Sequence, residues 1–256
     1  MSVTALWSDL RSASSAPDRA PLMRWMIFTG LCAFAGVLLW EYGLLQLMLA
    51  SDRTYISAII TLLYIASSLH CLWRTIAISR EGDAGRHAAR ILIKPDMVAS
   101  IAVSSSQQVA LPPGLITDHI RNLVIKAETQ GSGNLDQMLL LRSLADSLRG
   151  SNGFGGFASD TLLKLGLLGT IVGFIIMLAP IAAIDATDRA NMKSSMGLMS
   201  DGMAIAMYTT LAGLVGSILL KIQYYMLDAA TARVFSQAVT LTETRVVPAL
   251  ERLHAR

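Results

Sequence analysis

The sequence has little charge for its size. Of its 256 residues, only 15% are Asp, Glu, Lys or Arg, whereas 53% are hydrophobic, and the mean hydropathy is +0.52. A soluble domain carries about 25% charged residues, so this chain lacks the charge needed to cover a globule in water. The composition therefore argues against a soluble protein and favours a membrane protein.

Residues that serve catalysis or metal binding are also scarce. Cys32 and Cys71 fall in separate apolar runs and form no CxxC pair, which argues against a disulfide framework or a thiolate metal site. The four histidines are scattered without the spacing of a zinc site. No GxSG or GxGD protease motif occurs. The sequence thus predicts no enzyme, catalytic residue, metal or cofactor, and its small net charge of +3 suggests no nucleic-acid partner.

Long apolar runs, by contrast, are abundant. A helix needs about 20 apolar residues to cross a bilayer, and four stretches reach that length. They predict an all-α polytopic membrane protein with four transmembrane helices and a helical cytoplasmic segment. The predicted spans are residues 25–49, 55–77, 161–184 and 202–227.

The basic residues predict the orientation of these spans. Only three of the 21 Lys and Arg residues, Arg53, Arg189 and Lys193, lie in the two loops that would face outward. Because cytoplasmic loops are enriched in Lys and Arg, both termini are predicted to be cytoplasmic. The predicted parts are an N-terminal segment 1–24, helices 1 and 2 in 25–77, a cytoplasmic helical segment 78–160, helices 3 and 4 in 161–227, and a cytoplasmic C-terminal helix 228–256.

The cytoplasmic segment contains two stripes of helical period. Ile116, Ile120, Leu123 and Ala127 predict one helix. A second stripe runs from Leu135 through Met138, Leu141, Ala145 and Leu148 to Gly150, with Asn134 as its expected cap. The two helices would pack on each other or on a neighbour. After the fourth span no helix breaker precedes Pro248, so that helix is expected to continue into the cytoplasm.

Small residues are concentrated in the last two spans. "LKLGLLGTIVGF" (164–175) contains Gly166, Gly169 and Gly173, and "MYTTLAGLVGS" (207–217) contains Gly213 and Gly216. Small residues at this spacing let helix backbones approach closely in lipid. These glycines predict that spans three and four pack tightly, either on each other or on copies of the chain.

Threonines accompany these glycines. Thr170 lies in the third span, and Thr209 and Thr210 lie side by side in the fourth. A membrane threonine can simply donate to the carbonyl four residues earlier in its own helix. The alternative is a narrow polar lining for an ion route, and the residues alone leave both open.

The paired segments "LGLLGTIVGF" and "GMAIAMYTTLAGLVGSILL" resemble the last two membrane helices of the MotA/TolQ/ExbB proton channel family. The resemblance covers about residues 162–227, and two helices before the large loop are similar to the flagellar-stator layout. It implies a channel-forming subunit of an ion-motive-force-driven transducer in the bacterial inner membrane. It also implies a homopentamer and a single-span, Asp-bearing partner of the MotB/TolR/ExbD type. TolQ and ExbB have a Glu where this chain has Ile205.

The two family-like spans contain no Asp, Glu, His, Lys or Arg within residues 165–184 and 202–220. Ion-coupling proteins normally need one near mid-membrane, and Glu41 is expected near the outer end of span one. The absence fits a partner that supplies the aspartate. Thr170 and Thr210 are then expected to line the route of a proton or a sodium ion, with Thr209 as a helper and the glycines admitting the partner helix. The alternative function is a membrane scaffold that assembles through its glycine faces without conducting ions.

Overall fold

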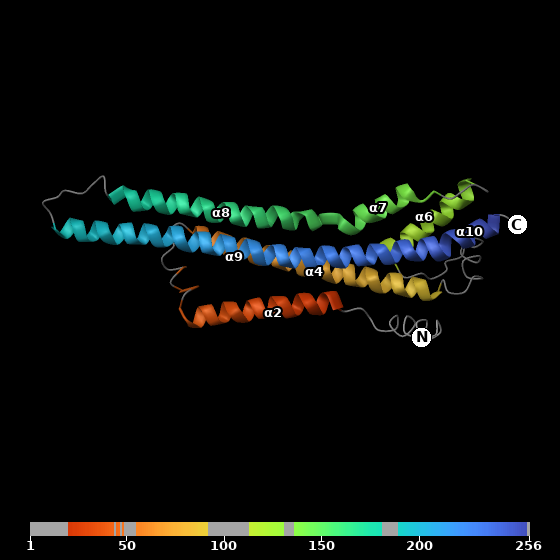
Figure 1. Cartoon of the computed structure of the whole chain (residues 1–256), viewed down its shortest axis with the longest axis horizontal. Coiled ribbons are helices and arrows are strands. Elements are labelled where there is room, and N and C mark those ends of the chain that lie inside the picture. Colours follow the sequence, from red (N-terminus) through yellow and green to blue (C-terminus); the bar gives the residue numbers. More distant parts are fainter. Residues whose placement is uncertain are drawn as a thin grey trace, which may run out of the picture. The chain divides into compact units, whose positions relative to one another are not determined.

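The structure, a computed structural model, is helical throughout its described part and contains no strand there (Figure 1). This confirms the all-α fold class. Four of its helices are long and apolar enough to cross a membrane, so the chain is a multi-pass membrane protein. The described residues are 20–43, 45–46, 48, 55–91, 113–130, 136–180 and 189–254.

Nine helical elements make up this part of the chain. The α-helices are α2 (Ala20–Glu41), α4 (Ile56–Ile91), α6 (Leu115–Gln130), α7 (Met138–Arg149), α8 (Gly153–Leu178), α9 (Arg189–Leu241) and α10 (Val247–His254). A 3₁₀ turn, η1 (Gly150–Asn152), precedes α8, and a π-helical turn, η3 (Thr242–Val246), follows α9.

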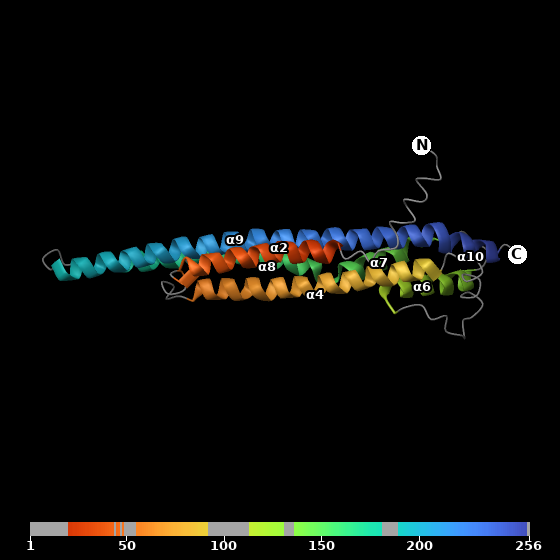
Figure 2. The same ribbon diagram turned by 90° about the horizontal axis from the view of Figure 1, so that it is seen from below.

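Contacts divide the chain into two compact units. Unit 1 comprises residues 1–23, 74–151 and 227–256, and unit 2 comprises residues 24–73 and 152–226. Helices α4 and α9 contribute residues to both. Figure 2 shows α9 as one unbroken helix, which contains the whole predicted fourth span and extends beyond it at both ends.

The first span ends earlier than its apolar run suggests. Helix α2 stops at Glu41, and the backbone N–H of Gly43 donates to the Trp40 carbonyl at 2.9 Å. Gly43 has a φ of +73°, a left-handed conformation that terminates helices and that glycine adopts without strain. Glu41 therefore lies at the end of the helix, which does not continue to the expected Leu49.

The helix that contains the predicted fourth span begins before residue 202, because α9 starts at Arg189, inside the loop expected at 185–201. Residues 181–188 lie outside the described part. After α9 the chain stays helical through η3 and then through α10, which contains Pro248. There the Val247 N–H donates to the Thr242 carbonyl, five residues back. A proline clashes with the carbonyl four residues before it, and the wider π turn accommodates this.

Unit 1 has a core of large aliphatic side chains. All four residues of the first predicted stripe, Ile116, Ile120, Leu123 and Ala127, are buried on α6, which confirms that helix. Helix α6 packs on α7 and on α10. On α7 the predicted stripe is partly wrong: Leu148 is buried as expected, but Met138 is 72% exposed. Asn134, the expected cap, lies outside the described residues.

Side chains of α4 hold the ends of α6 and α7. Glu81 Oε2 accepts a 2.9 Å hydrogen bond from the Leu115 N–H at the start of α6. Arg74 Nη2 donates to the Leu148 and Arg149 carbonyls at 2.9 and 3.1 Å, at the end of α7. Each pairing puts a charge at the helix terminus that favours it. Burial raises the pKa of the Glu81 carboxyl above its ordinary value, although the Leu115 bond opposes this.

Candidate functional site

Helices α8 and α9 lie side by side in unit 2, and their backbones touch (Figure 1). A Cβ placed on Gly166 would lie 3.2 Å from the Gly213 Cα, and one placed on Gly213 would lie 2.7 Å from the Leu162 carbonyl oxygen. Only glycine fits at such a contact, because any side chain would force the backbones apart. Of the two arrangements open from the sequence, the structure shows the glycines of spans three and four packed on each other.

The contact continues in both directions along the two helices. Toward one end, a Cβ on Gly173 would lie 2.7 Å from the Gly202 carbonyl oxygen. Toward the other end, the hydroxyls of Ser159 and Ser217 lie 3.0 Å apart, both buried. We call this contact the α8–α9 seam: Gly155, Ser159, Gly166, Gly169 and Gly173 on α8, with Gly202, Thr209, Gly213, Ser217 and Tyr224 on α9.

Thr209 belongs to the seam. It is fully buried, and its hydroxyl donates to the Ile205 carbonyl at 2.8 Å within α9. A Cβ on Gly169 would overlap the Thr209 hydroxyl. The side chain therefore fills the space that Gly169 leaves, and its hydroxyl is satisfied by its own helix.

Thr170 and Thr210 lie differently, because both are only half-buried. The Thr210 hydroxyl is 3.0 Å from the Ala206 carbonyl and 3.3 Å from the Gly166 carbonyl of α8. The Thr170 hydroxyl donates to the Leu167 carbonyl at 2.6 Å. The two hydroxyls thus meet consecutive carbonyls of one turn of α8. Each has a single proton to donate and keeps lone pairs that can accept a hydrogen bond.

Two further positions of interest do not join this arrangement. A Cβ on Gly216 would meet only Leu162 and Tyr64, at 3.8 and 3.9 Å, so an alanine would fit there. Ile205, which occupies the position of the Glu in TolQ and ExbB, is buried at 2% exposure. No cluster of three or more metal-binding side chains occurs among the described residues.

The outer faces of α8 and α9 carry large apolar side chains. A water-soluble monomer rarely exposes a patch of this extent, whereas a lipid-facing helix does. The exposed residues include Leu163, Leu167, Leu168, Ile171, Phe174, Ile175 and Leu178 on α8, and Met203, Met207, Leu211, Leu214, Val215 and Ile218 on α9.

A polar cluster at one end of the seam was not predicted. His70 Nδ1 lies 2.8 Å from the hydroxyl of Tyr224, and the Phe154 ring meets the His70 ring edge-on at 5.2 Å between centroids. Tyr224 is buried, and its ring occupies the space beside Gly155. The sequence signal that could have pointed to this end of the seam is the regular spacing of small residues along α8, which extends back to Gly155.

These features define a polytopic membrane protein in which a pair of helices is joined by small residues and carries two half-buried hydroxyls. A model of the MotA/TolQ/ExbB proton channel family matches residues 152–239. The match agrees with the resemblance seen in the sequence, and the matched residues include all of α8 and most of α9. No curated protein and no solved structure matches the chain.

Proposed function

We propose that this chain is the channel-forming subunit of an ion-motive-force-driven energy transducer in the bacterial inner membrane, with both termini cytoplasmic. It conducts protons between a ring of its own copies and a single-span, Asp-bearing partner of the MotB/TolR/ExbD type. One observation carries the proposal: within the family-matched residues, the Thr170 and Thr210 hydroxyls meet consecutive carbonyls of one α8 turn.

The Thr170 and Thr210 hydroxyls suit a mechanism in which the carboxyl that carries the proton belongs to another chain. Neither 165–184 nor 202–220 contains an Asp, Glu, His, Lys or Arg, and a bare charge in lipid is costly. A threonine accepts a hydrogen bond from a protonated carboxyl, and after rotation it donates to the carboxylate. Thr170 and Thr210 therefore offer a partner's aspartate a bonding position in either protonation state. Thr209, enclosed by Gly169, supports the route by fixing the spacing of the two helices.

The ring and the partner must use faces outside the α8–α9 seam. The seam glycines are occupied within the chain, because backbone or a side chain of the neighbouring helix fills the space beside each of them. We therefore propose that the partner helix contacts the half-buried threonines Thr170 and Thr210. It does not contact the seam glycines. Contacts between copies would use the exposed apolar faces. The number of copies, five, follows from the family alone.

The second candidate is a scaffold that assembles without conducting ions. It is favoured by the fact that the hydroxyls of Thr170, Thr209 and Thr210 all have a carbonyl acceptor within the chain. Packing alone would then account for every small residue of the seam.

Valine replacements separate the two functions, since valine keeps the shape of threonine and removes the hydroxyl. The chain and its partner are reconstituted in liposomes, and proton flux is measured for Thr170→Val and Thr210→Val. The control is Thr61→Val, because the Thr61 hydroxyl also donates to a carbonyl of its own helix, that of Ser57 at 2.9 Å. We expect flux to fall about tenfold or more in the first two, the effect of about 1.4 kcal/mol, and to be unchanged in the control. If both variants assemble and conduct like the wild type, the scaffold is supported and the channel route is wrong.

A further inference from the structure

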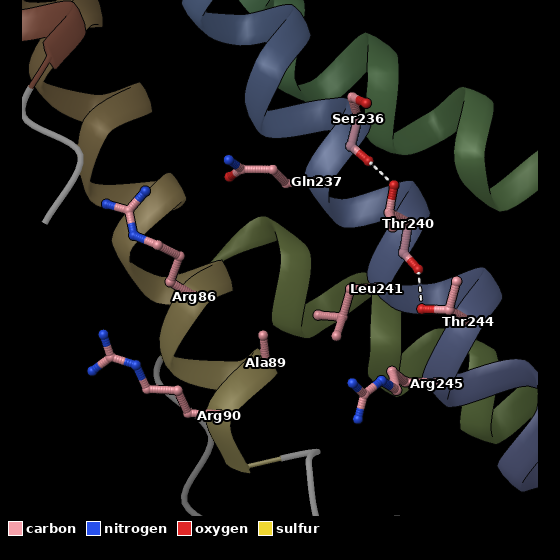
Figure 3. Close-up of a pocket in the computed structure, with 9 residues that line it drawn as sticks. All are labelled: Arg86, Ala89, Arg90, Ser236, Gln237, Thr240, Leu241, Thr244 and Arg245. Carbon is pink, nitrogen blue, oxygen red and sulfur yellow. Dashed lines mark hydrogen bonds between the residues drawn. The ribbon is translucent and has the colours of Figure 1, made fainter. Parts of the chain in front are cut away.

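Unit 1 contains a basic groove between α4 and the end of α9. The groove has a volume of about 430 Å³, and its nine lining residues include three arginines and no carboxylate. Arg86 and Arg90 come from α4 and Arg245 comes from η3. Figure 3 shows Leu241 and Arg245 extending toward α4 from the opposite side.

A smaller apolar recess of about 160 Å³ lies next to the groove. Both cavities are lined by Arg86, Ala89, Gln237 and Leu241, so they are direct neighbours. Ile116 of the α6 core lines the recess beside Gly85. The site therefore combines a cationic rim with an adjacent apolar recess.

A π-helical turn carries part of the rim. Thr244 and Arg245 belong to η3, whose wider turn changes the direction of the side chains that follow α9. Such turns are often found at functional sites. The hydroxyls of Thr240 and Thr244 donate to carbonyls of their own helix, those of Ser236 and Thr240, and keep lone pairs that can accept hydrogen bonds.

We propose that this groove binds a nucleotide, with its phosphates on the arginine rim and its base in the apolar recess. Guanidinium groups bind phosphate through two parallel hydrogen bonds. The volume lies within the roughly 300–1,000 Å³ of small-molecule sites, whereas inorganic phosphate would leave the recess empty. Arg86 forms an ion pair with Asp83, an exposed residue that does not line the groove. A bound polyanion would therefore compete with the Asp83 carboxylate for Arg86. The cytoplasmic supply of the nucleotide rests on the topology proposed above.

The test is direct binding of ATP to the purified full-length chain in detergent, by isothermal titration. Tripolyphosphate and adenosine are the comparison ligands. Arg90→Gln and Arg245→Gln remove one guanidinium each, and Ala89→Glu adds a carboxylate to the lining. Arg142→Gln is the matched control, because Arg142 is exposed on α7 and does not line the groove.

We expect saturable ATP binding that weakens about tenfold in each arginine variant, is lost in Ala89→Glu and is unchanged in Arg142→Gln. Tripolyphosphate should bind more weakly than ATP, and adenosine more weakly still. The proposal is overturned if the wild type does not bind ATP at millimolar concentration, if the groove variants bind like the control, or if tripolyphosphate binds as tightly as ATP. No partner is present and no flux is measured, so this outcome is independent of the channel proposal.

Discussion

The α8–α9 seam of unit 2 and the α6 core of unit 1 bury different kinds of residue. In unit 2, the α8–α9 seam buries glycine, serine and threonine, while leucine, isoleucine and phenylalanine cover the outside. In unit 1, α6 buries Ile116, Ile120 and Leu123 and exposes Asp118 and Arg121. Water drives large apolar side chains inward, whereas lipid does not distinguish them from itself, and close backbone packing holds helices together there. This is the difference that we expect if lipid surrounds unit 2 and water surrounds unit 1.

The same difference predicts which substitutions each unit tolerates. Unit 2 should be sensitive to added volume along the seam and insensitive to changes on its outer face. Unit 1 should be sensitive to lost volume in its core.

The largest effect is expected for Gly169→Leu, because any side chain there overlaps Thr209. A leucine adds four carbons against the fully buried Thr209 side chain, so its cost should exceed the roughly 1–3 kcal/mol that is usual when methylene groups are inserted into a packed core. We expect loss of the α8–α9 pair, measured as loss of assembled protein extracted from membranes. The control is Gly156→Leu in the same helix, where a Cβ meets nothing within 4 Å. Equal amounts of both assembled variants would contradict the seam.

A smaller effect is expected for Ile120→Ala in unit 1. The side chain is fully buried, and removing it from a core costs about 2–5 kcal/mol. Hydrogen exchange of the α6 amides should accelerate accordingly. Leu167→Ala, at a position 63% exposed on α8, should leave the exchange of α8 nearly unchanged. If the two changes have similar effects on their own helices, the two units do not differ in solvent.

The smallest effect concerns pH. Burial lowers the pKa of His119 on α6 below the ordinary 6.5. Below pH 6.5 the unfolded state therefore binds a proton more readily than the folded state. Stability contributed by the neutral imidazole is complete above pH 6.5 and is lost as the pH falls toward the folded-state pKa, by at most about 1.4 kcal/mol per pH unit.

The measurement is hydrogen exchange of the α6 amides, corrected for intrinsic rates, between pH 7 and pH 5, in the wild type and in His119→Gln. Glu81 acts with the opposite sign, because its raised pKa contributes stability that is lost as the pH rises above the ordinary value of 4.5. Both proteins contain Glu81, so subtracting the pH dependence of α6 exchange in His119→Gln from that in the wild type removes the Glu81 contribution. Protection that falls equally in both on acidification would show that His119 is not its source.

Local sequence patterns predicted the features that depend on one helix at a time. The period of Ile116, Ile120 and Leu123 identified α6, and the uninterrupted run after the fourth span identified the extension of α9. The early end of α2 depends on a single glycine, Gly43, within an apolar run. Hydrophobicity alone does not show such a stop.

The site depends on how two helices align, which one helix does not reveal. Thr209 and Thr210 are adjacent in sequence, yet only the register of α9 against α8 puts the first in the seam and the second beside Gly166. Gly155 and Gly202 extend the seam beyond the predicted glycines because each meets the opposite helix. The groove likewise joins Arg86 and Arg245, which are far apart along the chain.

The most direct test of the central claim is whether proton flux requires both this chain and an aspartate from its partner. The partner to use is a neighbouring gene product with one span, an Asp near its start and an extracytoplasmic domain. Proton uptake driven by a pH gradient is measured in liposomes that hold the chain alone, both proteins, or both with that Asp changed to Asn. Because residues 165–184 and 202–220 contain no Asp, Glu, His, Lys or Arg, we predict flux only with both wild-type proteins. Equal flux from the chain alone, or with the Asn variant, would contradict the account.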